Sequence, residues 1–178
     1  MNYKLKDVFK KPDIKMMCMI GIMIAIEVVT HRMLGIQTPI VQIHFGFIPI
    51  VVVALLYGPF YSGLAWAIAD TIGTLLFPTG AFFPGFTITA FISGVIFGIF
   101  LYKSKKTILN TILAVLIVNI FMTLALDMYW IYVISGQTFI ALLPSRLIKC
   151  AVMIPTQIIA ILLIKKHDSI LNMKKTPS

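Results

Sequence analysis

Residues 79–91 read Thr-Gly-Ala-Phe-Phe-Pro-Gly-Phe-Thr-Ile-Thr-Ala-Phe, an uncharged run near the middle of a very apolar chain. Pro84-Gly85 predicts a turn, because proline fixes φ and glycine admits positive φ. A turn flanked by aromatic rings is out of place in water but suits a membrane surface or a pocket mouth, where the rings can stack on a flat ligand. We therefore expect Phe83, Pro84, Gly85 and Thr87 to form part of a ligand pocket.

The whole chain has the composition of a membrane protein. Of its 178 residues, 60% are hydrophobic and 12% are charged, and the mean hydropathy is +1.00. A soluble domain averages about 45–50% apolar and about 25% charged residues. The composition therefore predicts an all-α integral membrane protein with one multi-pass domain.

Six apolar segments are expected to cross the bilayer as one compact bundle. They cover about residues 16–30, 45–56, 60–76, 85–101, 108–132 and 138–164. The second segment is short for a span of roughly 20 residues, so we expect it to be tilted or partly buried. This divides the chain into a basic N-terminal segment (1–15), a six-helix substrate-binding domain (16–164) and a basic tail (165–178).

The basic residues set the expected orientation. Twelve of the fifteen lysines and arginines lie in the N-terminal segment, the connection after the fourth span and the tail. With six spans these three regions share one side of the membrane, and cytoplasmic loops are the ones enriched in Lys and Arg. Both termini are therefore expected in the cytoplasm. The net charge of +9 then reflects contact with anionic lipid, and we expect no nucleic-acid partner.

Charged residues inside the spans indicate a polar cavity. A charge within a span costs about 2.5–3.5 kcal/mol on insertion scales, so it usually faces the bundle interior. Five of these residues fall toward the outer half of their spans, which predicts a cavity open to the outside above a dry inner half. The five are Glu27, Asp70, Asp127, Arg146 and Lys149. Internal ion pairs between Asp127 and either Arg146 or Lys149 are an equally weighted alternative.

Helical spacing places these charges on faces with other polar or aromatic residues. The expected faces are Gly63, Trp66, Asp70 and Gly73 on the third span, Asn119, Thr123, Asp127 and Trp130 on the fifth, and Arg146, Lys149, Met153 and Gln157 on the sixth. Either tryptophan taken alone is more often a packing or interfacial residue than a ligand contact.

A separate face of the first span carries three small residues: Cys18, Gly21 and Ala25. Small residues at this spacing allow another helix to approach closely. Packing within the bundle and docking of an external partner are both consistent with it. The two cysteines of the chain are isolated and suggest no disulfide.

Enzyme motifs are missing from the sequence. It contains no phosphate-binding GxxxxGK[ST] loop, no HExxH, no CxxC and no GxSxG, and its three histidines are scattered. We therefore expect no catalytic residue, no metal site and no cofactor. A membrane protein with a pocket but no energy source suggests a binding subunit that relies on an ATPase elsewhere.

Several stretches resemble a known family. Residues 82–91 (FFPGFTITAF) and 143–149 (LPSRLIK), supported by 44–49 (HFGFIP) and 67–70 (AIAD), are similar to the substrate-binding S component of an energy-coupling factor (ECF) vitamin transporter. Within that family the chain looks most like its folate-specific members. The family usually carries AxxxA on the first span, and this chain has GxxxA at Gly21 and Ala25.

The resemblance implies a function and its partners. An S component of a bacterial cell membrane would bind its vitamin with high affinity under the loops after spans one and three. It would then join a transmembrane coupling protein and two cytoplasmic ATPases, which would drive its reorientation and release of the vitamin inside. The face of Cys18, Gly21 and Ala25 would dock on the coupling protein.

Folate chemistry assigns hypothetical roles to the candidate residues. A carboxylate can accept hydrogen bonds from the amino edge of a pterin, which suggests Asp70, with Asp127 as the alternative. Phe83 and Trp130 could sandwich the rings. The dianionic tail suggests a basic partner, for which the candidates are Arg32, Arg146 and Lys149. Asn119 is included because it shares a face with Asp127.

Three other functions remain open. The first is an S component for another vitamin, such as thiamine or riboflavin. The second is a membrane scaffold protein without a transport role, which would need no polar cavity. The third is an integral membrane enzyme, which the missing motifs disfavour.

Overall fold

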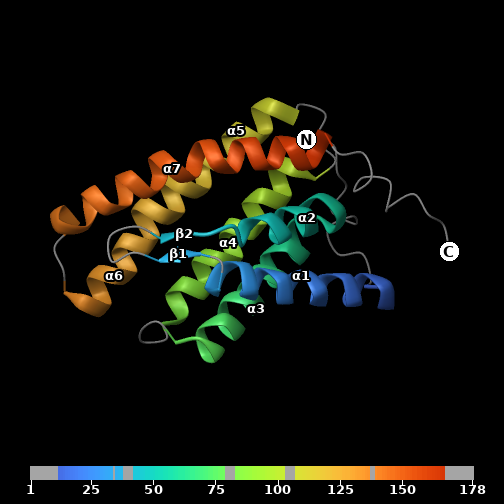
Figure 1. Cartoon of the computed structure of the whole chain (residues 1–178), viewed down its shortest axis with the longest axis horizontal. Coiled ribbons are helices and arrows are strands. Elements are labelled where there is room, and N and C mark those ends of the chain that lie inside the picture. Colours follow the sequence, from blue (N-terminus) through green and yellow to red (C-terminus); the bar gives the residue numbers. More distant parts are fainter. Residues whose placement is uncertain are drawn as a thin grey trace.

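The computed structural model describes residues 12–33, 35–37, 42–78, 83–102, 107–136 and 139–166. Most of the predicted basic N-terminal segment and basic tail therefore lie outside the described residues. The chain forms α1 (Ile14–Arg32), α2 (Phe47–Tyr57), α3 (Pro59–Leu76), α4 (Pro84–Leu101), α5 (Thr107–Ile117), the π-helix η2 (Val118–Leu126), α6 (Asp127–Ser135) and α7 (Phe139–Lys166). Since α5, η2 and α6 follow one another without a break, the described part of the chain is a bundle of six helical segments, as predicted (Figure 1).

Short strands interrupt the helical pattern between α1 and α2. Strands β1 (Ile36–Gln37) and β2 (Gln42–Ile43) pair antiparallel. The sequence predicts only a loop between the first two spans. Figure 1 shows the pair between α1 and α7, near the end of the bundle where α6 ends and α7 begins.

The second helix lies at the centre of the bundle. Of its eleven residues, nine are buried, among them Phe47, Ile50 and Val51, which have no exposed surface. A helix that is apolar on all sides has no face for water, so it is stable only inside a larger structure. Its length of about 16 Å is too short for the roughly 30 Å hydrocarbon layer. The predicted burial of this short segment is confirmed.

Small residues bring α3 and α4 together. A Cβ atom at Gly94 would lie 2.5 Å from the Ser62 carbonyl oxygen and 2.7 Å from the Cα of Gly63. The Ser62 hydroxyl donates a 2.8 Å hydrogen bond to the Gly94 carbonyl, so the two backbones are in direct contact. This close approach brings the start of α4 beside the end of α3, where Asp70 lies.

The outside of the bundle suits a lipid environment. Four segments of the described chain are long and apolar enough to cross a membrane: α1, α4, the combined α5–α6 helix and α7. Many large apolar side chains on them are exposed, including Ile22, Leu109 and Leu163. Figure 1 shows the start of α1, the end of α4, the start of α5 and the end of α7 at one end of the bundle. That arrangement matches the predicted topology, in which these regions share one side.

Candidate ligand-binding site

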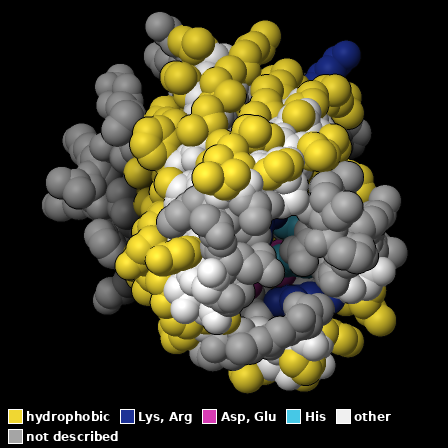
Figure 2. Space-filling view, turned by 90° about the vertical axis from the view of Figure 1, so that its left-hand side faces the viewer, with side chains coloured by type: hydrophobic (Ala, Val, Ile, Leu, Met, Phe, Trp, Pro, Cys, Tyr) yellow, Lys and Arg dark blue, Asp and Glu magenta, His cyan; other side chains and the backbone are white. Residues whose placement is uncertain are grey.

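A cavity of about 330 Å³ lies among α1, α3, α4, η2, α6 and α7, with the segment after β2 on its border. This volume is within the range of about 300–1,000 Å³ that is usual for small-molecule sites. Figure 2 shows a hollow with basic, acidic and histidine side chains inside it, and hydrophobic side chains cover much of the described surface above it. The lining residues are His31, Arg32, His44, Trp66, Asp70, Thr74, Phe83, Phe86, Thr89, Ala90, Ser93, Val118, Asn119, Met122, Asp127, Ile131, Arg146, Lys149, Met153 and Gln157.

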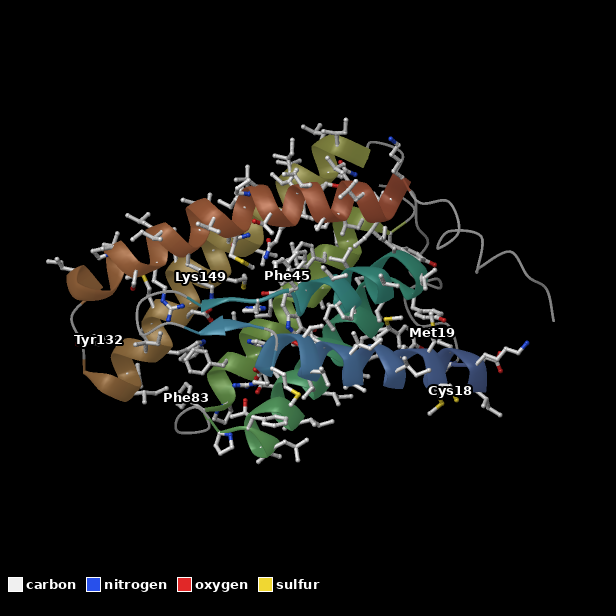
Figure 3. All side chains as sticks on the ribbon, viewed as in Figure 1. Cys18, Met19, Phe45, Phe83, Tyr132 and Lys149 are labelled. Atoms are coloured by element: carbon white, nitrogen blue, oxygen red, sulfur yellow. The ribbon has the colours of Figure 1, made fainter. Side chains whose placement is uncertain are left out.

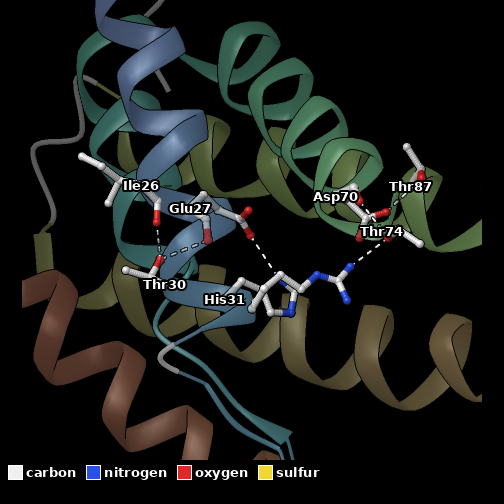
Figure 4. Close-up of polar contacts among 8 residues, drawn as sticks. Ile26, Glu27, Thr30, His31, Asp70, Thr74 and Thr87 are labelled. Carbon is white, nitrogen blue, oxygen red and sulfur yellow. Dashed lines mark hydrogen bonds and ion pairs between the residues drawn. The ribbon is translucent and has the colours of Figure 1, made fainter. Parts of the chain in front are cut away.

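A chain of hydrogen bonds crosses one wall of this cavity. Nη2 of Arg32 donates to the hydroxyl of Thr74 at 2.8 Å, and that hydroxyl donates to the Asp70 carbonyl at 2.8 Å (Figure 4). The Asp70 carboxylate accepts a 2.9 Å hydrogen bond from the Thr87 hydroxyl on α4. These contacts hold the ends of α1, α3 and α4 together. They also fix the side chains of Arg32 and Asp70, which both line the cavity.

Two histidines meet at the cavity border. His31 Nδ1 lies 3.1 Å from Oε1 of Glu27, a carboxylate that is only 1% exposed (Figure 4). The His31 ring stacks on the ring of His44, with the centroids 4.0 Å apart. Burial lowers the pKa of His44 well below its usual 6.5, and the charges of His31, Lys149 and Arg32 lower this pKa further. His44 is therefore neutral at neutral pH, and its Nδ1 has no hydrogen-bond partner among the described residues.

Aromatic side chains form a second wall. The rings of Phe83 and Trp130 are in contact, with centroids 5.4 Å apart and a tilt of 52°. The Trp130 Nε1 donates to the hydroxyl of Thr89 at 3.1 Å. A Cβ atom at Gly85 would lie 2.6 Å from the Trp130 ring, so only glycine allows this contact. Because the two rings touch and only Phe83 lines the cavity, Trp130 stands behind the Phe83 ring in this structure. A flat ligand could enter between them only if they separated.

The cationic side of the cavity comes from α7. Arg146 and Lys149 line the cavity opposite Asp127, and within the described residues neither makes an ion pair with Asp127 within 4.0 Å. Figure 3 shows Lys149 on the side of α7 that faces the strand pair. Asp127, Arg146 and Lys149 all line the cavity, and the internal ion pair stays a prediction.

Comparison with known proteins shows the family to which this chain belongs. The family model for "ECF-type riboflavin transporter, S component" matches residues 11–168. The chain belongs to the S components of ECF-type transporters.

Relatives of this S component carry a more specific name. The folate transporter FolT of Clostridium novyi (strain NT) is 38% identical over 148 residues, which are 83% of this chain and 86% of the relative. FolT of Leuconostoc mesenteroides subsp. mesenteroides is 32% identical over 157 residues, which are 85% of this chain and 84% of the relative. A crystal structure of FolT bound with folic acid is similar to this fold with a TM-score of 0.80 and 36% identity, and covers 85% of this chain and 93% of that one. The predicted resemblance is confirmed, and the chain is a membrane transport subunit rather than an enzyme or a scaffold.

The structure brings together seven of the eleven residues predicted to bind ligand in this S component. Those that line the cavity are Arg32, Asp70, Phe83, Asn119, Asp127, Arg146 and Lys149. The other four stand behind the lining. Thr87 bonds Asp70, Gly85 and Trp130 support Phe83, and Pro84 is an exposed residue at the start of α4.

Sequence reasoning missed several lining residues. His31 and His44 were treated as scattered, because their contact depends on the chain reversal through β1 and β2. Gln157 was noted only for its helical face, and Trp66 was expected to pack, although it both stacks on Phe97 and lines the cavity. The spacing of Gln157 with Lys149 and Met153 was the one signal that could have identified it.

The face of Cys18, Gly21 and Ala25 is exposed on α1, and a Cβ atom at Gly21 would meet nothing within 4 Å. Figure 3 shows Cys18 pointing outward from α1, at the opposite end of the bundle from Phe83. Among the described residues, no other helix packs against this face at Gly21, as packing within the bundle would require. No metal-binding cluster of His, Cys, Asp or Glu occurs in the described part of the chain.

Proposed function

We propose that this S component binds folate from the extracellular side and delivers it to an ECF complex for ATP-driven uptake. The observation that carries the proposal is the similarity over most of the chain to two folate transporters and to a folate-bound structure. The cavity adds chemical support, because it combines aromatic rings for a flat heterocycle with three cations for a dianionic tail. Riboflavin, which the family description names, has no such tail.

Individual residues take roles within this proposal. Asp70 accepts hydrogen bonds from the amino group of the pterin, and Thr87 holds its carboxylate in place. Phe83 packs against the rings, and Trp130 reaches them only if its ring separates from that of Phe83. Arg146 and Lys149, together with Arg32, pair with the carboxylates of the tail, where an arginine can form two parallel hydrogen bonds. Asn119 and Asp127 provide further polar contacts on the η2–α6 side.

The decisive experiment is to purify the full chain and identify the small molecule that accompanies it. Calorimetric titration with folic acid, riboflavin and thiamine then ranks the three ligands. We expect folic acid to bind at least about a hundredfold more tightly than the other two, since they lack a dianionic tail. Tighter binding of riboflavin or thiamine would overturn the proposal.

The proposed partners are a transmembrane coupling protein and two cytoplasmic ATPases in a bacterial cell membrane. The exposed small-residue face of α1 is the proposed docking surface, because another helix can approach it closely. Co-purification with a coupling protein tests this surface. Ala25→Trp should abolish the complex, whereas Leu163→Trp, at an exposed position of α7, should leave it intact. Equal effects of both changes would argue against docking through α1.

Both termini are proposed to face the cytoplasm. The support is that the described ends next to the basic segments share one end of the bundle. Labelling with a membrane-impermeant thiol reagent in intact cells tests this orientation. Starting from a Cys18→Ala background, a cysteine at Lys166 should be protected and one at Gly136 should react. The reverse pattern would invert the topology.

A further inference from the structure

The inner part of the cavity contains two amide side chains whose orientation follows from the helix backbone. Nδ2 of Asn119 donates a 2.8 Å hydrogen bond to the Val115 carbonyl, one turn earlier on the same helix. A carbonyl oxygen can only accept, so the nitrogen of this amide must face Val115. The same Nδ2 group donates to Oε1 of Gln157 on α7, also at 2.8 Å. Gln157 therefore turns its oxygen toward Asn119 and leaves its Nε2 group for another partner.

The remaining polar atoms of this pair belong to the cavity. Asn119 is 2% exposed and Gln157 is 5% exposed, yet both line the cavity. Among the described residues, Nε2 of Gln157 and Oδ1 of Asn119 make no hydrogen bond, and neither atom is fully buried. The pair thus offers one donor and one acceptor in a largely water-excluded place. A buried polar group that stays unpaired is costly, so a ligand that matches both groups is favoured over one that matches neither.

Neighbouring contacts make the pair rigid. Asn119 lies in the first turn of η2, and its own carbonyl oxygen is 3.6 Å from the Cys150 sulfur, which donates to it from α7. Two contacts therefore tie the same turn of η2 to α7. A donor and an acceptor held by two helices have a fixed separation and direction, which is the condition for selective recognition.

We propose that Gln157 and Asn119 read the lactam edge of the ligand's heterocycle. Nε2 of Gln157 donates to the ring carbonyl oxygen, and Oδ1 of Asn119 accepts from the adjacent ring N–H. In folate these groups are the 4-oxo oxygen and N3–H of the pterin. This inference rests on the proposed function and deepens it. It places the heterocycle at the inner part of the cavity and leaves the carboxylate tail to the basic residues.

The matched probe for this edge is aminopterin, the 4-amino analogue of folic acid. Its amino group replaces the carbonyl, and its N3 carries no proton, so donor and acceptor are exchanged along this edge while the tail is unchanged. A donor of Gln157 would then face a donor of the ligand. We expect the parent protein to bind folic acid at least about tenfold more tightly than aminopterin, as for other sites built to hydrogen-bond one ligand group.

Substitution of Gln157 tests the assignment in the full-length protein. Gln157→Glu replaces the donor with an acceptor of the same shape, so folic acid should bind at least about tenfold more weakly and aminopterin equally well or better. Gln157→Leu removes the hydrogen-bonding group, so the preference for folic acid should fall to within about threefold. The neighbouring Thr156→Val is the control, because the Thr156 hydroxyl bonds the Val152 carbonyl of its own helix.

The outcomes separate this inference from the proposed function. If the parent does not bind folic acid, the proposed function fails and the inference fails with it. If the parent binds folic acid but both Gln157 variants keep its preference over aminopterin, only the inference is overturned. Equal weakening of both ligands would also overturn it, since that result indicates a packing role for Gln157. Retained aminopterin binding in Gln157→Glu shows that this variant folds.

Discussion

Oδ2 of Asp70 on α3 accepts a 2.9 Å hydrogen bond from the hydroxyl of Thr87 on α4, at the wall of the cavity. Within the described residues, Oδ1 of Asp70 has no recorded partner, and Asp70 lines the cavity. One carboxylate oxygen is thus used to hold the side chain, while the other remains for a ligand. Thr87, which does not itself line the cavity, is therefore a residue that orients a binding group.

The first prediction concerns this carboxylate. Asp70→Asn should weaken folic acid binding by roughly tenfold or more, because hydrogen bonds to a charged group are worth about 1.5–3 kcal/mol. Titration calorimetry measures the effect. Asp13→Asn is the matched control, since Asp13 is exposed at the start of α1 and asparagine also caps helices well. Unchanged affinity in Asp70→Asn would remove Asp70 from the proposed site.

The second prediction concerns the tail of the ligand. Arg146→Gln should weaken folic acid by about tenfold or more, because it removes one partner of a charge-assisted hydrogen bond. Binding of pteroic acid, which lacks the glutamate, should change by less than about threefold, since Arg146 then has no glutamate to pair with in the parent either. Lys166→Gln, at the exposed end of α7, is the control. Equal losses for both ligands would show that Arg146 does not contact the tail.

The third prediction concerns pH. Because burial lowers the pKa of His44 below 6.5, the folded protein binds this proton less well than the unfolded chain does. The stabilising contribution of neutral His44 is therefore fully present above about pH 6.5 and is lost as the pH falls below it, by at most about 1.4 kcal/mol per pH unit. Thermal unfolding of the ligand-free protein between pH 7.5 and 5.5 measures this slope.

His44→Gln should reduce that slope, because glutamine does not titrate. His167→Gln provides the comparison, as it removes a histidine of the C-terminal tail. If the parent and His44→Gln lose stability in parallel on acidification, another group is responsible.

The fourth prediction concerns the contact between α3 and α4. Gly94→Ala would place a methyl group against the backbone of Ser62 and Gly63, so we expect a loss of about 1–3 kcal/mol and a lower unfolding temperature. Gly21→Ala is the control, since its Cβ meets nothing and alanine favours helix by about 1 kcal/mol. A Gly94→Ala protein as stable as the parent would show that the two helices can separate at no cost.

Much of the architecture follows from the sequence alone. The cost of placing a charge or a polar backbone in hydrocarbon depends on local composition, so the apolar segments and the basic clusters predict the helical bundle and its topology. The same rule identifies Asp70, Asp127, Arg146 and Lys149 as interior residues, because such charges rarely face lipid.

Only the tertiary structure determines which of these groups meet. The bond between Asp70 and Thr87 depends on the close packing of α3 on α4. The His31–His44 stack depends on a chain reversal whose strand register the sequence alone does not give. Likewise, Asn119 meets Gln157 across 38 residues of sequence. Helical periodicity gives the face on which a residue lies but not the rotation and depth of the neighbouring helix. Those quantities come from side-chain packing over the whole bundle, and they turn a set of interior polar residues into a shaped cavity.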